Sequence, residues 1–229
     1  MSTSQSSESL WLKTYNLSPS KVTKLLLSTI AILVLFNLIE RGTVYWLNSQ
    51  NNGQFISIYF NFDEETNLPS LYSSLALGFC TYLLAIIATL KKKVKTKYAK
   101  HWQALAWIFL YLAIDEICSI HELLNPSFCL VIIFLVVFRK FILALPSKTK
   151  VLFLLAGTIY IFGALGMEMI GGYIADSYVY NSFYGIASTI EELSEMLGVV
   201  IFINALLNYL QSQVSELHFC LSFQRQKRK

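Results

Sequence analysis

The chain has 229 residues, of which 55% are hydrophobic and only 14% are charged. A soluble domain usually carries about 25% charged residues, so the composition excludes an ordinary soluble globular protein. The formal net charge of +4 does not indicate nucleic-acid binding, because the basic residues collect at the ends of apolar runs. Several runs of about 18 or more mostly apolar residues instead predict an all-α, multi-pass membrane protein that forms one transmembrane bundle.

The predicted elements begin after a polar, Ser-rich segment, residues 1–20, that we expect to be a disordered tail. The first apolar run is too long for a signal peptide and lacks a small-residue cleavage pattern. Pro69 predicts the start of the second span. The fourth span needs residues beyond its short apolar run, with Arg139 and Lys140 reaching the headgroups. We predict six spans, at about residues 22–47, 69–90, 102–124, 127–145, 151–170 and 186–210.

The segments between the spans predict an orientation for the bundle. With six spans both termini lie on one side of the membrane, and every basic residue except Arg41 then falls on that side. The positive-inside rule makes this side cytoplasmic, including the basic tail at 212–229. An aromatic loop at 171–185 is predicted on the opposite side, between spans five and six. The four cysteines (Cys80, Cys118, Cys129 and Cys220) show no paired spacing, and we expect no disulfide framework.

Acidic side chains inside the predicted spans are the main functional signal. A charged residue in mid-bilayer costs about 2.5–3.5 kcal/mol, so such residues usually mark a site. The orientation puts all of them in the outer half of the bundle, in one layer. They are eight of the chain's 14 acids: Glu40, Asp115, Glu116, Glu122, Glu168, Glu191, Glu192 and Glu195.

Helical spacing predicts that these acids face the bundle interior. Asp115, Ser119 and Glu122 share one stripe, with Cys118 and His121 beside it. On the last span Ser188, Glu191, Glu195 and Gly198 align. Glu168 shares a face with Ala164, Gly171 and Gly172, small residues that allow neighbouring helices to approach closely.

This layer predicts a metal- or cation-binding site. Carboxylates with an imidazole suit iron, manganese or zinc. Di-iron bundles use Glu-x-x-His pairs, which this chain lacks, so a carboxylate-rich mono- or dinuclear site is the expected form. The candidate ligands are Asp115, Glu116, His121, Glu122, Glu168, Glu191, Glu192 and Glu195. The candidate supporting residues are Asn37, Glu40, Arg41, Cys118, Ser119 and Ser188.

Other interpretations stay open at this point. Intramembrane acids also form proton or cation relays that need no bound metal. A membrane metallohydrolase or oxidoreductase acting on a lipid-soluble substrate is a further alternative, although zinc hydrolases generally need three protein ligands. A purely structural role, with protonated acids held by hydrogen bonds, is the simplest reading. The sequence predicts the lipid bilayer and a cation or proton as partners, no nucleic acid, and no particular oligomeric state.

Four motifs in the spans occur together: Asn67-Leu-Pro-Ser-Leu-Tyr-Ser-Ser74, Asp115-Glu-x-x-x-x-His-Glu122, Gly166-x-Glu168 and Glu191-Glu-x-x-Glu-Met-Leu-Gly198. In this combination the chain resembles a group of uncharacterised multi-pass bacterial membrane proteins, over most of residues 37–210. The resemblance implies an integral protein of the bacterial inner membrane, and it carries no activity with it.

Overall fold

The structure, a computed structural model, describes residues 15–16, 18–47, 59–62, 67–118, 128–178, 182–213 and 218–219. Nearly all of these residues are helical. The elements, in chain order, are β1 (Tyr15–Asn16), α1 (Pro19–Leu47), α3 (Leu68–Lys93), α4 (Ala99–Cys118), α5 (Phe128–Leu143), α6 (Ser147–Ile161), the π-helix η2 (Phe162–Met167), α7 (Glu168–Tyr178), α8 (Ser182–Gln213) and β2 (His218–Phe219).

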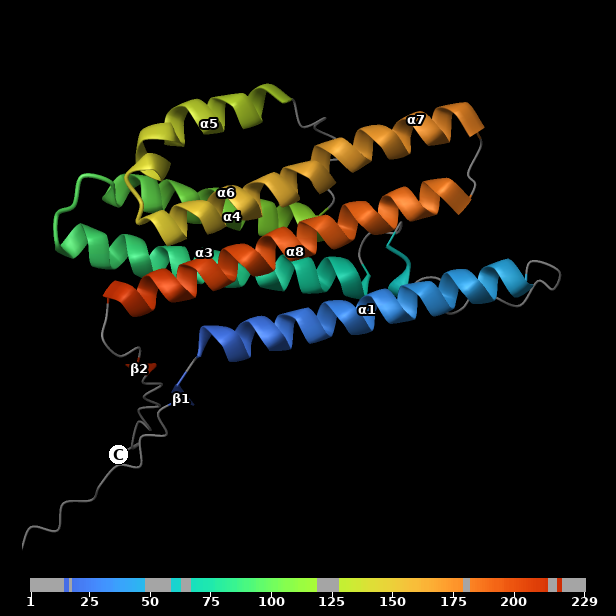
Figure 1. Cartoon of the computed structure of the whole chain (residues 1–229), viewed down its shortest axis with the longest axis horizontal. Helices are drawn as coiled ribbons and strands as arrows, with labels where there is room; N and C mark the ends of the chain where they lie inside the picture. The colour runs from blue at the N-terminus through green and yellow to red at the C-terminus, as the bar shows by residue number, and fades with distance from the viewer. Residues whose placement is uncertain are drawn as a thin grey trace, which may run out of the picture.

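The helices run side by side as a bundle, and successive passes point in opposite directions (Figure 1). α6, η2 and α7 follow one another without a break and form one long helix. Among the described residues, four helices are long and apolar enough to cross a membrane: Pro19–Thr43, Leu68–Lys93, Ser147–Asp176 and Phe183–Gln213. The prediction of an α-helical membrane protein is therefore confirmed at this level. β1 and β2 are two residues each and pair antiparallel where the two ends of the chain meet.

The α3–α4 hairpin shows how local sequence sets these elements. Asn67 caps α3, accepting a hydrogen bond from the Ser70 backbone N–H at 3.0 Å, and Pro69 lies in the first turn, as predicted. α3 ends in a Schellman-type turn, in which the N–H of Thr96 donates to the carbonyl of Lys91. Lys95 takes the left-handed conformation that this turn requires, with φ 53°. The chain then returns as α4, whose backbone carbonyl at Ala113 accepts a hydrogen bond from Ser74 at 2.6 Å.

The core is centred on α8. The side chains of Ile203, Ala205 and Leu206 on α8 are fully buried. Aromatic rings join the other helices to it: Trp102 of α4 stacks on Tyr209 of α8, with centroids 5.0 Å apart. Large apolar side chains instead cover the outer surface of the bundle, as expected for a protein surrounded by lipid; Leu35, Val136 and Leu154 are examples.

The predicted loop at 171–185 is the main difference from expectation. α7 continues to Tyr178, and α8 already begins at Ser182. Adjacent glycines often end a helix, but here Gly171 is buried where α7 meets α8. A Cβ atom on Gly171 would lie 3.8 Å from the Tyr184 ring and 3.9 Å from the Ala187 methyl group. A Cβ would make only ordinary van der Waals contacts at these distances, and Gly171 lies within the α7–α8 contact without ending the helix. Residues 119–127 and most of both predicted tails lie outside the described residues.

Candidate functional site

Acids from three helices act electrostatically on Glu195 of α8. The charges of Glu192, Glu116, Glu191 and Glu168 all act on the Glu195 carboxyl group. Glu116 comes from α4, Glu168 from the first residue of α7, and the others from α8 itself. We call these five residues, together with Asp115, the carboxylate cluster. Most of its members are partly buried in the bundle, and only Glu168 is exposed.

The π-helix η2 lies directly against this cluster. A Cβ atom on Gly163 would be 2.7 Å from the backbone oxygen of Glu191 and 3.0 Å from the Glu195 side chain. The absence of a side chain at Gly163 thus allows the backbone of η2 to approach α8 at the acids. π-Helical segments are rare and occur frequently at functional sites. In this chain the segment packs against α8 at Glu191 and Glu195.

Tyr160 of α6 belongs to the same region, although the sequence analysis did not select it. The charges of Glu195, Glu116, Glu192 and Asp115 act on its hydroxyl group. Its position depends on Gly198 of α8, because a Cβ atom there would come within 2.9 Å of the Tyr160 Cβ. The only sign in the sequence that could have pointed to Tyr160 is a hydroxyl group in the middle of an apolar run.

The predicted face of Glu168 does not hold in full. Gly171 is buried as expected, but Glu168 and Gly172 are exposed. The prediction used the 3.6-residue period of an α-helix, whereas η2 immediately precedes Glu168 and has wider, i→i+5 turns. These turns change the rotation between Ala164 and Glu168, whereas Glu168, Gly171 and Gly172 all lie in the α-helix α7 and keep α-helical spacing.

The supporting residues on α1 form a separate polar contact with α8. Asn37 is completely buried and donates to the Phe60 carbonyl at 3.1 Å. Its side-chain oxygen accepts hydrogen bonds from Arg41 Nε at 3.2 Å and from Thr189 Oγ1 at 3.3 Å. Gly185 of α8 leaves the space that the Arg41 guanidinium group occupies. The asparagine therefore ties α1 to α8 and to residues 59–62.

Two more supporting residues have structural surroundings of their own. Glu40 is buried next to this contact, with 3% of its surface exposed. Ser188 is also buried and donates to the Phe62 carbonyl at 3.2 Å, so its hydroxyl group secures the same short segment. Phe60 and Phe62 were not predicted to contribute, because a polar loop gives no periodic signal from which their backbone contacts could be inferred.

The remaining predicted residues contribute less to this picture. Cys118 is exposed at the end of α4 and is a free thiol, as is the buried Cys80. Ser119, His121 and Glu122 lie outside the described residues. Within the described part of the chain, no three His, Cys, Asp or Glu side chains form a group that could hold a metal ion. The described acids thus gather within electrostatic range without forming a metal-ligand set by themselves.

Comparison with known proteins gives a family but no activity. Residues 25–210 match a family described as a domain of unknown function, DUF8692. The chain belongs to this family. The matched range covers the helices from α1 to α8, and with them every residue of the carboxylate cluster. Neither the curated proteins nor the solved structures include a match to the chain.

Proposed function

We propose that this DUF8692 protein binds a cation at the carboxylate cluster. The observation that carries the proposal is the convergence on Glu195 of acids from α4, α7 and α8. The largest charge effects on Glu195, which come from Glu192, Glu116, Glu191 and Glu168, are all those of acids. The π-helix beside the cluster is a second, independent feature that supports a functional role for this place.

The physical reason is the repulsion between carboxylates in a medium with little water. Two unit charges 4 Å apart repel each other by about 4 kcal/mol at an effective dielectric constant near 20. A bound cation removes this repulsion, and carboxylate oxygens suit hard cations such as Mg²⁺, Ca²⁺ or Mn²⁺. His121 and Glu122 follow the described end of α4 and are the candidates to complete a ligand set for Mn²⁺, iron or zinc.

Proton transfer without a metal is the second candidate. Two observations favour it: the Tyr160 hydroxyl lies among the same acids, and the described residues form no three-ligand group. Acids combined with a hydroxyl group are the usual components of intramembrane proton relays. In this case the cluster would be neutralised by protons that Glu195 and its neighbours exchange.

The orientation belongs to the same proposal. The described lysines and arginines, Arg41 excepted, lie at the start of α1, at the α3–α4 turn and around the α5–α6 turn, all at one end of the bundle (Figure 1). The positive-inside rule then favours six passes with cytoplasmic termini. The carboxylate cluster would lie in the outer half of a bacterial plasma membrane, open to cations from outside the cell.

The decisive experiment compares Glu195→Gln with Asp176→Asn, a matched change of one exposed acid that does not act on Glu195. Thermal unfolding of the purified proteins in detergent is followed with Na⁺, Mg²⁺, Ca²⁺, Mn²⁺ or Zn²⁺ at constant ionic strength. A cation that binds the cluster stabilises wild type and Asp176→Asn by about 2.7 kcal/mol at 100 times its Kd. We expect Glu195→Gln to lose most of this gain and to be more stable than wild type without the cation.

The outcomes separate the two candidates. An equal gain in wild type and Glu195→Gln would show that the cation binds elsewhere and would reject the cluster as its site. If no cation stabilises the protein, but proton flux into liposomes is present in wild type and lost in Glu195→Gln, the relay is the function. Elemental analysis of wild type beside His121→Ala with Glu192→Ala then tests for a resident iron, manganese or zinc ion.

A further inference from the structure

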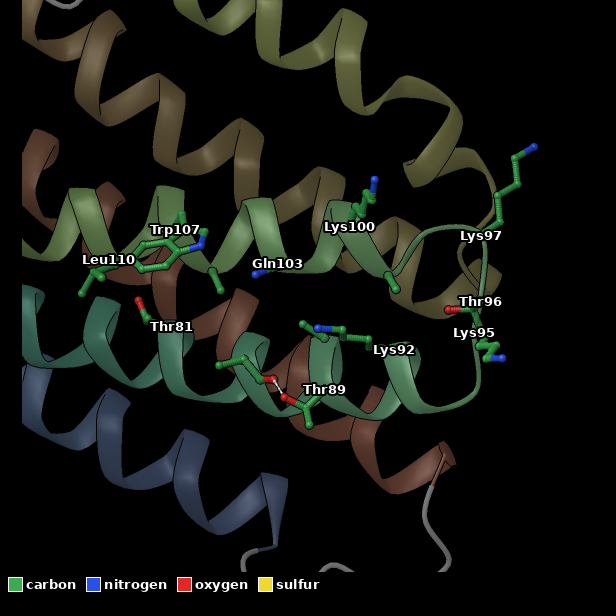
Figure 2. Close-up of a pocket in the computed structure, with 14 residues that line it drawn as sticks. Thr81, Thr89, Lys92, Lys95, Thr96, Lys97, Lys100, Gln103, Trp107 and Leu110 are labelled. Carbon is green, nitrogen blue, oxygen red and sulfur yellow. Dashed lines mark hydrogen bonds between the residues drawn. The ribbon is translucent and has the colours of Figure 1, made fainter.

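A groove lies between α3 and α4, at the end of the bundle opposite the carboxylate cluster. It has a volume of about 660 Å³, which is in the range of small-molecule sites. Figure 2 shows its lining, with Lys92 and Gln103 pointing into the space between the two helices. Lys95, Lys97 and Lys100 line the end of the groove at the turn, and in this view the amino groups of Lys97 and Lys100 point away from the space between the helices. Among the described residues that line it, none is acidic.

The lining changes character along the helix axis. The lysines lie at the end of α3, in the turn and at the start of α4. Because α3 is one of the helices able to cross the membrane, this is where the chain leaves the lipid. Farther in, the groove is lined by small and apolar side chains, among them Ala85, Trp107 and Leu110. Along α3, Lys92 and the innermost residue Thr81 are about 16 Å apart, from a rise of 1.5 Å per residue. Trp107 is 64% exposed and faces the surroundings of the bundle.

The lysines of the groove keep their charge free for a ligand. Lys92, Lys95 and Lys100 have no ion pair with another described residue, and Lys97 contacts only the ring of Tyr98, 5.5 Å from its centroid. The neighbouring Lys91 differs, because it donates to the side chain of Gln213 on α8 at 2.5 Å. Lysines of a single run thus have two roles. Lys91 contacts α8, and the others named here line the groove.

The position of Lys95 adds a second observation. It occupies the left-handed position of the turn, where glycine is the usual residue because it carries no Cβ. A lysine there weakens the turn and places a positive charge at the mouth of the groove.

We propose that the groove binds one anionic phospholipid, with the headgroup phosphate at Lys92, Lys95 and Lys100. The acyl chains would follow the apolar part of the groove past Trp107 and Leu110. The charge of the lysines complements the phosphate, and the change from basic to apolar lining matches the order of headgroup and chains in a lipid. Basic pockets between helices at the membrane surface are the type of site that recognises anionic headgroups. The proposal does not depend on what the carboxylate cluster binds.

The test is native mass spectrometry of the purified full-length chain, titrated with phosphatidylglycerol, phosphatidylcholine, glycerol phosphate or inorganic phosphate. We expect one tightly bound phosphatidylglycerol per chain, much weaker phosphatidylcholine binding, and no competition from the two soluble phosphates. Lys92→Gln should weaken phosphatidylglycerol binding about fivefold, and Lys92→Gln with Lys100→Gln about 30-fold. Lys92→Arg should retain binding.

Lys93→Gln is the matched control, since it removes the same charge from the same run at a residue outside the groove. We expect a change of less than about twofold for this variant, because an exposed charge that does not line the groove is screened by solvent and contributes little. Equal losses in Lys92→Gln and Lys93→Gln would mean that only general electrostatic attraction acts, and would overturn the proposal. So would equal binding of the two lipids. Competition by inorganic phosphate would assign the groove to a soluble anion. Each variant is first checked for the wild-type Tm.

Discussion

The two ends of the bundle carry opposite charges in different ways. At one end, acids from three helices lie close together inside the bundle, and the helix backbones approach each other at Gly163 and Gly198. At the other end, lysines on one hairpin surround an open groove and face outward. Like charges can be gathered at little cost where water and headgroups reach them. Inside the bundle they need close packing to hold them and an occupant to neutralise them.

The orientation of the two ends across the membrane gives the largest expected effect, because a fused reporter is either active or inactive on a given side. A reporter that is active only in the cytoplasm should be active when fused within residues 91–100 and inactive within 176–182. A reporter active only outside should show the reverse. The physical reason is the strong retention of lysine clusters on the cytoplasmic side. The reverse pattern of activities would put the carboxylate cluster in the inner leaflet.

The close packing at the acidic end predicts the next largest effect. Gly163→Ala should lower the free energy of unfolding by about 2–3 kcal/mol, because the added methyl group would overlap the Glu191 backbone oxygen. Gly157→Ala is the control on the same long helix, and it has nothing within 4 Å of the added Cβ. It should be neutral or stabilising by up to about 1 kcal/mol. The measurement is unfolding in a mixed-micelle denaturant series; equal effects of the two variants would contradict the close contact.

The turn at the basic end predicts the smallest effect, with the opposite sign. Lys95→Gly should raise the free energy of unfolding by about 1 kcal/mol, because glycine adopts the left-handed conformation without a Cβ clash. The same unfolding assay measures it. Lys97→Gly is the control, since its backbone is not in the left-handed region, and it should not stabilise the chain. A loss of stability in Lys95→Gly would mean that the lysine side chain supports the turn.

Much of the helical arrangement could be predicted from the sequence, because membrane spans need long apolar runs and leave a strong signal. The start of α3 beside Pro69 was readable because it depends on adjacent residues. The sequence did not predict that α7 continues through Gly171 and Gly172. A glycine that ends a helix and a glycine within a helix look alike in sequence. The groove could not be predicted from the sequence either. Its lysines were visible as a charge cluster, but the space between them depends on how α3 packs on α4.

For the candidate site, which acids are neighbours was easier to predict than which way each helix turns its side chains. Acids on different spans at one depth were expected to be neighbours, and Glu116 and Glu168 do act on Glu195. The exposure of Glu168 could not be foreseen, because an unbroken α-helix was expected where the π-helical turns of η2 precede it. Tyr160 was missed for a related reason: a single hydroxyl group in an apolar run is common, and only the neighbouring helices reveal what surrounds it.

The hydrogen bond between Thr189 and Asn37 has a consequence for how the chain is assembled. The two residues are 152 positions apart, so the partner on α8 is made long after α1. At about 5–20 residues per second, the interval is about 8–30 s. During that time α1 has entered the membrane with an amide group that lacks its final partner, and only the last helix supplies it. The first and last helices must therefore find each other late in biosynthesis. A chain truncated before α8 would keep the Phe60 and Arg41 partners of Asn37 and lose its link to the last helix.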